Sequence, residues 1–163
     1  MTAPALAGIL HLSDLPQPHD QISDWYQAGW PHWYGPGGTG DARQDLKACL
    51  EAPDTLPQCL VAVDRASTPV GTVSLRSTSP GSNLYPGAWL TALLVPEDLR
   101  RNGIGTALVA AAENEAAQLG FDRIHATTGS AMTILKNRRW EQVDQVETAS
   151  GKLAIFRKDV PAR

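Results

Sequence analysis

Hydrophobic and polar positions along this chain change repeatedly between a period of two and a period near 3.6, which predicts strands interleaved with helices. Short runs rich in β-branched residues predict strands at residues 9–12, 59–64, 70–76, 123–127, 142–147 and 152–158. Five residues join the second strand to the third, as in a hairpin, and the last two strands form a closing hairpin. Residues 88–95 are almost wholly apolar, which is typical of a central strand covered on both faces, and Pro96 ends this strand.

Four segments carry apolar residues at helical spacing. The first follows Pro18, which suits a first helical turn, and its expected buried stripe is Ile22, Trp25, Tyr26 and Gly29. The second begins at an Asp41 N-cap, with Gln44 in capping-box position, and ends at Pro53; its expected stripe is Leu46, Cys49 and Leu50. The third ends at Gly120, with a stripe of Ile104, Ala107, Leu108, Ala111, Glu115 and Leu119, and residues 130–138 form the fourth. Residues 30–40 are so dense in glycine and proline that we expect a mobile loop there.

The order of these elements predicts the fold class. We expect an α/β (α+β layered) fold in which helices flank a mixed, mostly antiparallel central sheet. At 163 residues the chain has the length of one domain, so a single domain over residues 1–163 is predicted.

Composition and charge narrow the classes of function. Hydrophobic residues make up 42% of the chain and charged residues 19%, an ordinary globular balance. The net charge of −3 argues against an electrostatic binder of nucleic acid or of a membrane surface, and the longest apolar run is too short to span a bilayer. No basic residue precedes the apolar run of residues 1–12, so we expect no secretory signal and a cytoplasmic protein.

The cysteines and the distribution of charge add two further expectations. Cys49 and Cys59 match no metal-ligand spacing, so we expect free thiols in a reducing compartment and no metal site. Residues 1–64 hold eight acidic and two basic side chains, a net charge of −6, whereas the remainder carries +3. The basic part suits an anionic cofactor, while the acidic part either attracts a cationic substrate or is an ordinary solvated surface.

The stretch after the central strand carries the most informative motif. Residues 100–105, RRNGIG, fit the pattern R-x-x-G-x-G at the start of the third predicted helix. Glycines at such a turn expose successive N–H groups, and the helix N-terminus adds unpaired donors and partial positive charge, which together make a cradle for an anion. A Walker loop would need G-K-[ST], which is absent, and a dinucleotide fingerprint beginning at Gly103 would need glycine in place of Leu108. Arg100 and Arg101 add positive charge for a phosphate or diphosphate.

With this motif the chain resembles the GCN5-related N-acetyltransferase (GNAT) family. Residues 93–105, LLVPEDLRRNGIG, are similar to the family's central strand followed by Q/R-x-x-G-x-G/A. A second, more degenerate family segment covers residues 123–140, and its Asn-x-x-Ala-x-x-Leu-Tyr pattern falls on Thr128, Ala131, Ile134 and Leu135. The order of elements is similar across nearly the whole chain.

The resemblance implies an acetyl-CoA site and no metal. The diphosphate would lie on main-chain amides, and the pantetheine arm would pair with the end of the central strand, provided that this strand diverges from residues 123–127. The implied cofactor-binding residues are Leu93, Leu94, Val95, Arg100, Arg101, Asn102, Gly103, Ile104, Gly105 and Thr106, with the Thr128 hydroxyl replacing the family's asparagine. The reaction implied is transfer of acetyl to a primary amine of a small-molecule acceptor by direct attack. The alternative is an acyl-CoA sensor with little or no activity.

Two positions depart from the family pattern. Leu135 stands where a tyrosine commonly acts as general acid, and residues 88–95 lack the carboxylate that often serves as base. His32 and Tyr85 are therefore the candidate catalytic side chains, while His125 is expected to be a hydrogen-bonded core residue. Three aromatic residues are expected to wall the acceptor pocket or else to cover the core: Trp30, Trp33 and Tyr34. The closing hairpin leaves an edge through which two copies could pair as a homodimer.

Overall fold

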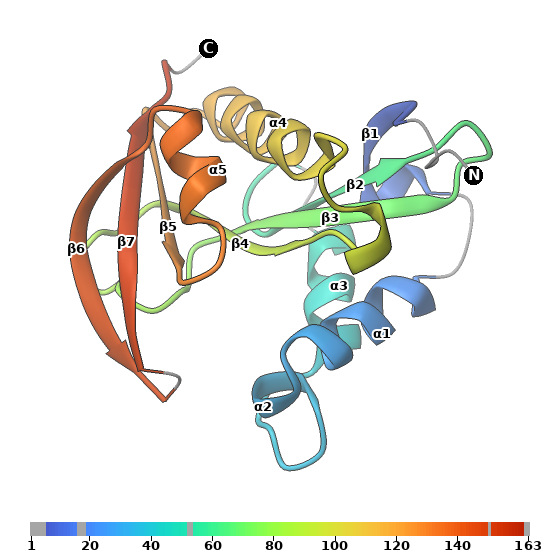
Figure 1. Ribbon diagram of the computed structural model, residues 1–163, viewed down its shortest axis with the longest axis horizontal. Helices are drawn as coiled ribbons and strands as arrows, with labels where there is room; N and C mark the ends of the chain where they lie inside the picture. The colour runs from blue at the N-terminus through green and yellow to red at the C-terminus, as the bar shows by residue number, and fades with distance from the viewer. Residues whose placement is uncertain (1–5, 16–18, 52–53, 150, 162–163) are drawn as a thin grey trace.

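A seven-stranded mixed sheet runs through the protein in the order β1-β2-β3-β4-β5-β7-β6 (Figure 1). The computed structural model describes residues 6–15, 19–51, 54–149 and 151–161. Every neighbouring pair of strands is antiparallel except β4 and β5, which are parallel. The strands are β1 (Gly8–His11), β2 (Gln58–Val63), β3 (Pro69–Arg76), β4 (Ala88–Leu94), β5 (Arg123–Thr128), β6 (Glu141–Thr148) and β7 (Gly151–Asp159). The predicted fold class and both predicted hairpins are thus confirmed.

Helices cover both faces of the sheet (Figure 1). They are α1 (Asp20–Gly29), α2 (Pro31–Tyr34), α3 (Ala42–Glu51), α4 (Ile104–Gln118) and α5 (Met132–Asn137), with short 3₁₀ turns at Leu12–Asp14 and Glu97–Leu99. In β2, Leu60 and Ala62 belong to the core under α4, whereas Cys59, Val61 and Val63 belong to the core under α1 and α3. This alternation is the period-two signal of a strand buried on both faces.

The start of α3 is capped as the sequence predicts. An Asp41 carboxylate oxygen accepts the Gln44 N–H at 3.1 Å, and the Asp41 carbonyl accepts the Asp45 N–H at 3.0 Å. This cap satisfies donors that the first helical turn leaves without partners.

Removing this cap gives a small, local test of the fold. We expect Asp41→Ala to lower the free energy of unfolding by about 1 kcal/mol, the usual contribution of an N-cap, whereas Asp41→Asn retains an acceptor oxygen and changes it little. Urea denaturation of the two variants measures the difference. Equal losses in both would show that the carboxylate oxygen does not cap α3.

Four sequence expectations are corrected by the structure. Residues 31–34 form helix α2 rather than a loop, because Pro31 is tolerated in a first turn and the Trp30 carbonyl accepts the N–H groups of Trp33 (3.0 Å) and Tyr34 (2.8 Å). Leu50 is 39% exposed and Trp25 is only partly buried, because each lies at the margin of its helix's apolar face. The buried face of α4 is also rotated, and its centre is formed by Ile104, Leu108, Val109, Ala112 and Ala116. The predicted Pro18 and Pro53 boundaries lie outside the described residues.

Strand β4 is covered on both faces only in its first half, so the expectation for residues 88–95 is half right. Ala88, Trp89 and Leu90 are buried, and the rest of the strand is partly exposed. Pairing with β5 stops at Leu90, beyond which the two strands diverge. On its other side β4 has a bulge opposite β3, where Ala92 adopts a φ of 51°.

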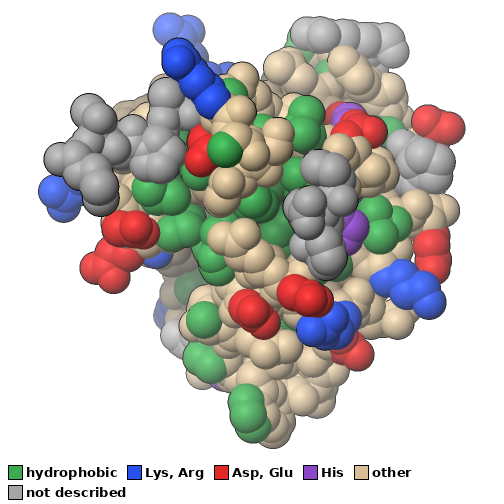
Figure 2. Space-filling model, turned by 90° about the vertical axis from the view of Figure 1, so that its right-hand side faces the viewer, with side chains coloured by type: hydrophobic (Ala, Val, Ile, Leu, Met, Phe, Trp, Pro, Cys, Tyr) green, Lys and Arg blue, Asp and Glu red, His purple; other side chains and the backbone are tan. Residues whose placement is uncertain are grey.

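Acidic and basic side chains both occur on the side of the molecule where β1 lies. Figure 2 shows acidic and basic side chains interspersed there among polar and apolar ones. Within the described residues, no helix has the length and apolar character needed to cross a membrane.

Candidate functional site

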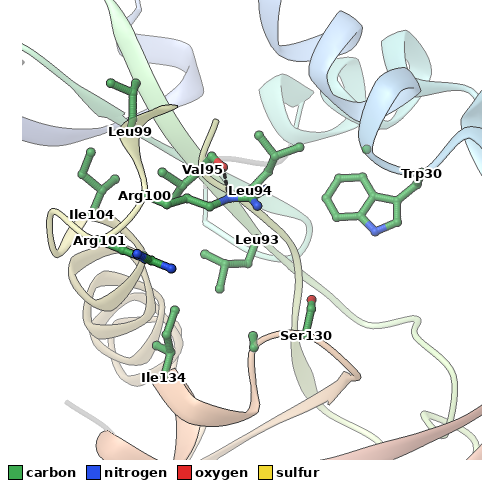
Figure 3. Close-up of a pocket in the computed structure, with 13 residues that line it drawn as sticks. Trp30, Leu93, Leu94, Val95, Leu99, Arg100, Arg101, Ile104, Ser130 and Ile134 are labelled. Atoms are coloured by element: carbon green, nitrogen blue, oxygen red, sulfur yellow. Dashed lines mark hydrogen bonds between the residues drawn. The ribbon is translucent and has the colours of Figure 1, made fainter. Parts of the chain in front are cut away.

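The divergence of β4 from β5 leaves a cavity of about 380 Å³ beside the end of β4. It lies between the N-terminus of α4, the start of α5 and the end of α1 (Figure 3). The residues that line it are Gly29, Trp30, Leu93, Leu94, Val95, Leu99, Arg100, Arg101, Ile104, Gly105, Ser130, Ala131 and Ile134. Beyond Leu90, the β4 main chain has no strand partner on this side, so its N–H and C=O groups are available to an extended ligand.

The N-terminus of α4 forms one wall of the cavity and is open to an anion. Gly103 is the N-cap with φ of 79°, and no side chain caps the helix. The first helical hydrogen bond runs from the Ala107 N–H to the Gly103 carbonyl at 3.0 Å, so Ile104, Gly105 and Thr106 have no intrahelical acceptor for their N–H groups. The first turn also contains no acidic residue. These unpaired donors and the helix dipole favour a bound phosphate.

The turn before α4 is held by its own side chains. The Asn102 amide donates to the carbonyls of Leu99 (3.0 Å) and Arg100 (3.2 Å). Arg101 has a φ of 68°, a left-handed conformation that is uncommon outside glycine. The Arg100 guanidinium donates from Nε to the Val95 carbonyl at 2.9 Å and so lies at the end of β4 (Figure 3). Both arginines line the cavity and give it positive charge.

The start of α5 forms the opposite wall, and here the predicted hydroxyl is used differently. Thr128 Oγ1 accepts the N–H groups of Ser130 (3.2 Å) and Ala131 (2.9 Å), so it caps the turn and does not line the cavity. Ser130 and Ala131 line it instead, two residues that sequence reasoning did not single out as site residues. The sequence signal that could have identified them is the threonine at position 128. A threonine at the end of a strand can form an ST-type turn, and such a turn places the residues that follow it beside the end of the strand.

Of the three aromatic residues predicted for the acceptor side, Trp30 lines the cavity and the other two do not. Trp33 is 48% exposed. Tyr34 is buried; its hydroxyl donates to Asp45 Oδ2 at 2.6 Å and accepts from Arg76 Nη1 at 3.0 Å. Burial raises the pKa of Tyr34 to about 12, with the neighbouring Arg76 charge opposing that rise. Tyr34 thus anchors α2 to the sheet.

The two predicted catalytic side chains also lie outside the residues that line the cavity. His32 is exposed on α2. Tyr85 precedes β4, at the end of the strand away from the cavity, and its hydroxyl donates to Asp144 Oδ2 at 2.9 Å. That hydrogen bond raises the pKa of Tyr85, with smaller contributions from burial and from the Asp144 charge.

His125 is a core residue, as predicted, but its hydrogen bonding differs from the prediction. It is 5% exposed and stacks on Tyr85 and Trp89, with ring centroids 5.1 Å away in each case. Its Nε2 is buried and has no hydrogen-bond partner among the described residues. Burial, together with the Arg123 and Arg157 charges, lowers the pKa of His125, so the ring is neutral at physiological pH.

The remaining candidate groups are the metal-ligating side chain types and the two cysteines. No cluster of three or more histidine, cysteine, aspartate or glutamate side chains occurs in that part of the chain. Cys49 and Cys59 are free and buried. Burial, followed by the charge of Cys59, raises the pKa of Cys49 to about 12, and burial also raises the pKa of Cys59. A buried thiol whose pKa is raised is a weaker nucleophile than an exposed one.

Comparison with known proteins identifies the family to which this chain belongs. The family model of the acetyltransferase (GNAT) family matches residues 19–134, which include the α4 N-terminus and all 13 residues that line the cavity (Figure 3). No curated protein matches the sequence.

Several solved structures share the fold. An aminoglycoside 6′-N-acetyltransferase complexed with coenzyme A is 19% identical with a TM-score of 0.73, over 96% of this chain and 98% of that one. A phosphinothricin acetyltransferase from Sinorhizobium meliloti in complex with AcCoA is 16% identical with a TM-score of 0.71, over 96% and 90% of the two chains. The aminoglycoside 6′-N-acetyltransferase from Enterococcus faecium is 21% identical with a TM-score of 0.71, over 96% and 98%. These likenesses show a shared fold, and because the family model covers well over half of the chain, the protein belongs to the GNAT family of acetyltransferases.

Proposed function

We propose that this protein transfers the acetyl group of acetyl-CoA to a primary amine of a small-molecule acceptor. The single observation that carries the proposal is the cavity where β4 leaves β5, next to the uncapped N-terminus of α4. The open strand edge offers main-chain groups to the amides of a pantetheine arm, and the helix terminus offers N–H donors to a diphosphate. Solved structures of the same fold, described as complexes with coenzyme A or AcCoA, support this cofactor.

The residues around the cavity fit such a cofactor in type and position. Main-chain N–H groups of Arg101, Asn102, Gly103, Ile104, Gly105 and Thr106 would hold the diphosphate, and the Arg100 and Arg101 side chains would add positive charge. Leu93, Leu94 and Val95 would pair with the arm through their main chain. The Arg100 guanidinium donates a hydrogen bond to the Val95 carbonyl. This side chain therefore has to move before the carbonyl can accept a hydrogen bond from the pantetheine arm. Acetyl-CoA supplies an acetyl group already activated as a thioester.

The acceptor side is formed by the end of α1. Gly29 and Trp30 line the cavity there, and α1 has no basic residue in its last turn. An aromatic face and a helix C-terminus both suit a nitrogen that carries positive charge in solution. The similar structures of aminoglycoside and phosphinothricin acetyltransferases support a small amine as acceptor.

Holding the amine against the thioester is the main contribution that these residues can make to the rate. Among the described residues that line the cavity, none carries a carboxylate or an imidazole, so the amine proton would leave to water. Leu135, at the position of the family's tyrosine, is fully buried in the core under α4 and donates no proton. We leave His32 and Tyr85 out of the proposed machinery because neither lies among the residues lining the cavity.

Two measurements test the proposal. Isothermal titration calorimetry with acetyl-CoA and with CoA should give dissociation constants between about 1 µM and 1 mM, the usual range for an enzyme substrate. A thiol-release assay should then detect CoA when the protein, acetyl-CoA and a panel of amines, including aminoglycosides and amino acids, are combined. Mass spectrometry of the acceptor should show the added acetyl group.

The buried Leu135 is the observation that favours a second candidate, an acyl-CoA sensor. A sensor binds acetyl-CoA but releases no CoA with any amine, so the two assays separate the candidates. Absence of binding at millimolar concentrations contradicts both.

Two further properties belong to this proposal. We place the protein in the cytoplasm. That compartment contains acetyl-CoA and keeps thiols such as Cys49 and Cys59 reduced. Strand β6 is one edge of the described sheet, and pairing of two such edges would give a homodimer. Sedimentation analysis measures the oligomeric state directly.

A further inference from the structure

Within the described residues, the cavity contains one uncharged polar side chain, that of Ser130. The lining residues are mostly apolar or glycine, and their charged side chains are Arg100 and Arg101. Ser130 supplies the one hydroxyl among the cavity-lining residues that the structure describes. An inference about Ser130 rests on the proposed function, since it concerns the same cavity.

Ser130 lies at the end of the cavity away from the proposed diphosphate site. Figure 3 shows Arg101 on the α4 side of Leu93 and Ser130 on the other side, with its oxygen directed toward the cavity. A chain that starts at the α4 N-terminus and follows the β4 edge therefore passes Leu93 before it reaches Ser130 and Trp30. These last two residues lie where the reactive end of the cofactor belongs.

The position of Ser130 is fixed while its hydroxyl stays available. The Ser130 N–H is bonded to Thr128 Oγ1 at 3.2 Å, and the Ala131 N–H is bonded to the same oxygen at 2.9 Å. The Ser130 hydroxyl itself makes no hydrogen bond to any described residue. It is a donor that faces the cavity on a backbone held by its neighbours.

We infer that the Ser130 hydroxyl donates a hydrogen bond to the sulfur atom of CoA as the thiolate leaves. In this step the amine nitrogen forms a bond to the carbonyl carbon, the carbon–sulfur bond breaks, and its electron pair goes to sulfur. The amine proton goes to water, and Ser130 keeps its own proton throughout. The sulfur of a thioester is a weak acceptor and a thiolate is a strong one, so this hydrogen bond is made mainly when the thiolate develops.

The pKa of the CoA thiol bound to the protein tests this inference without an acceptor or turnover. A donor that stabilises the thiolate lowers this pKa, and ultraviolet absorbance of the thiolate measures it in the binary complex. The protein contributes little signal of its own at mildly alkaline pH, because burial first of all raises the pKa of Tyr34 and of Cys49 to about 12 and raises the pKa of Tyr26 and of Cys59. The pKa of Tyr85 is raised as well, chiefly by its hydrogen bond to Asp144.

We expect the acid dissociation constant of bound CoA to fall roughly tenfold in Ser130→Ala, the effect of losing one hydrogen bond to a charged group. Ser130→Thr keeps the hydroxyl and should stay near the original protein. Thr133→Ala removes an exposed hydroxyl from the neighbouring helix α5, outside the cavity, and should change nothing.

The inference is overturned if Ser130→Ala binds CoA and leaves the thiol pKa unchanged, or if Thr133→Ala shifts it equally. A protein that binds no CoA at all contradicts the proposed function as well, whereas CoA binding with an unaltered thiol pKa contradicts only the role of Ser130. The calorimetric dissociation constant of each variant distinguishes these results.

Discussion

Replacing Thr106 with glutamate is expected to weaken CoA binding about 100-fold and to leave the protein folded. Thr106 is exposed in the first turn of α4, where the N–H groups have no intrahelical acceptor. A carboxylate at this position stabilises a helix, because it complements the positive end of the helix dipole. The same carboxylate repels a diphosphate. At roughly 5 Å and an effective dielectric constant of about 20, two unit charges repel by about 3 kcal/mol, which corresponds to the expected loss of affinity.

Thr106→Gln is the matched control, because it has nearly the same shape as the glutamate variant and no charge. Calorimetry should show near-normal CoA affinity for glutamine and weak binding for glutamate, with a difference that shrinks as salt is added. Thermal unfolding should show that both variants are folded. If glutamate binds CoA as well as glutamine does, the diphosphate does not lie at the α4 N-terminus.

The neighbouring glycines are less suitable for this test. Gly103 has a positive φ of 79°, so any side chain there strains the turn. A Cβ on Gly105 would lie 3.0 Å from Cδ1 of Ile134, so the Ile134 side chain, which itself lines the cavity, would have to shift. Loss of CoA binding in either variant would therefore not separate a filled site from a distorted one.

Removing the carboxylate of Glu113 should have the largest effect on stability. Glu113 lies in α4 and is almost fully buried. It accepts hydrogen bonds from Arg138 (2.9 Å from Nε and from Nη2), Trp140 Nε1 (3.0 Å) and Lys158 Nζ (2.7 Å), and so joins α4 to the chain before β6 and to β7. We expect Glu113→Ala to lower the free energy of unfolding by about 3 kcal/mol, near the lower limit for breaking a buried ion pair. The loss is near the lower limit because the Arg138 and Lys158 side chains are 31% and 23% exposed. Water can therefore solvate their charges once the carboxylate is removed.

Chemical denaturation measures this loss, and the melting temperature should fall by about 6–12 °C. Glu51→Gln is the control: its carboxylate lies on the surface of α3, 3.9 Å from Lys47 Nζ, and the change should cost less than about 0.5 kcal/mol. Equal losses in the two variants would mean that the network around Glu113 does not stabilise the fold.

The same network predicts a dependence of stability on pH. Burial alone would raise the pKa of Glu113, but hydrogen bonds from Arg138, Lys158 and Trp140 outweigh it and hold the pKa below its usual range. In the unfolded chain the pKa of Glu113 is about 4.3, and in the native protein it is lower. The stabilising effect of the carboxylate is therefore complete above the pKa of the unfolded chain. The effect is lost as the pH falls through the native pKa. In Glu113→Gln, the free energy of unfolding should decrease less steeply over this acid range.

The strands and the long helices could be predicted from the sequence because their signals are local. The alternation in residues 59–63 and the Asp41 cap depend on neighbouring positions, and both are present in the structure. Helix α2 could not be predicted in this way. It depends on Tyr34, whose ring packs on Tyr26 and whose hydroxyl reaches Asp45 and Arg76, residues far apart in the sequence. Contacts of this kind override a composition that disfavours helix.

In the candidate site too, the parts built from consecutive residues could be predicted from the sequence, and the parts built from distant residues could not. The R-x-x-G-x-G motif was enough to predict the turn before α4, because an anion cradle is made from consecutive main-chain groups. The other walls are made by single side chains from distant elements. Thr128 was predicted from its place in a pattern, but its hydroxyl is used by the turn that follows, and Ser130 lines the cavity instead. The conformation of the turn decides which of two nearby hydroxyls faces a cavity. The pattern of residue types in the sequence does not specify that conformation.

The narrow contact between β4 and β5 has a consequence for how this protein can vary. Within the described residues, strand pairing between the β1–β4 half of the sheet and the half that holds β5, β7 and β6 is limited to Ala88, Trp89 and Leu90 of β4. The two halves are joined by this short pairing and by α4, which packs against strands of both. Under the proposed function, a change of acceptor preference can therefore arise within α1–α3 while the proposed acetyl-CoA site on α4 is preserved.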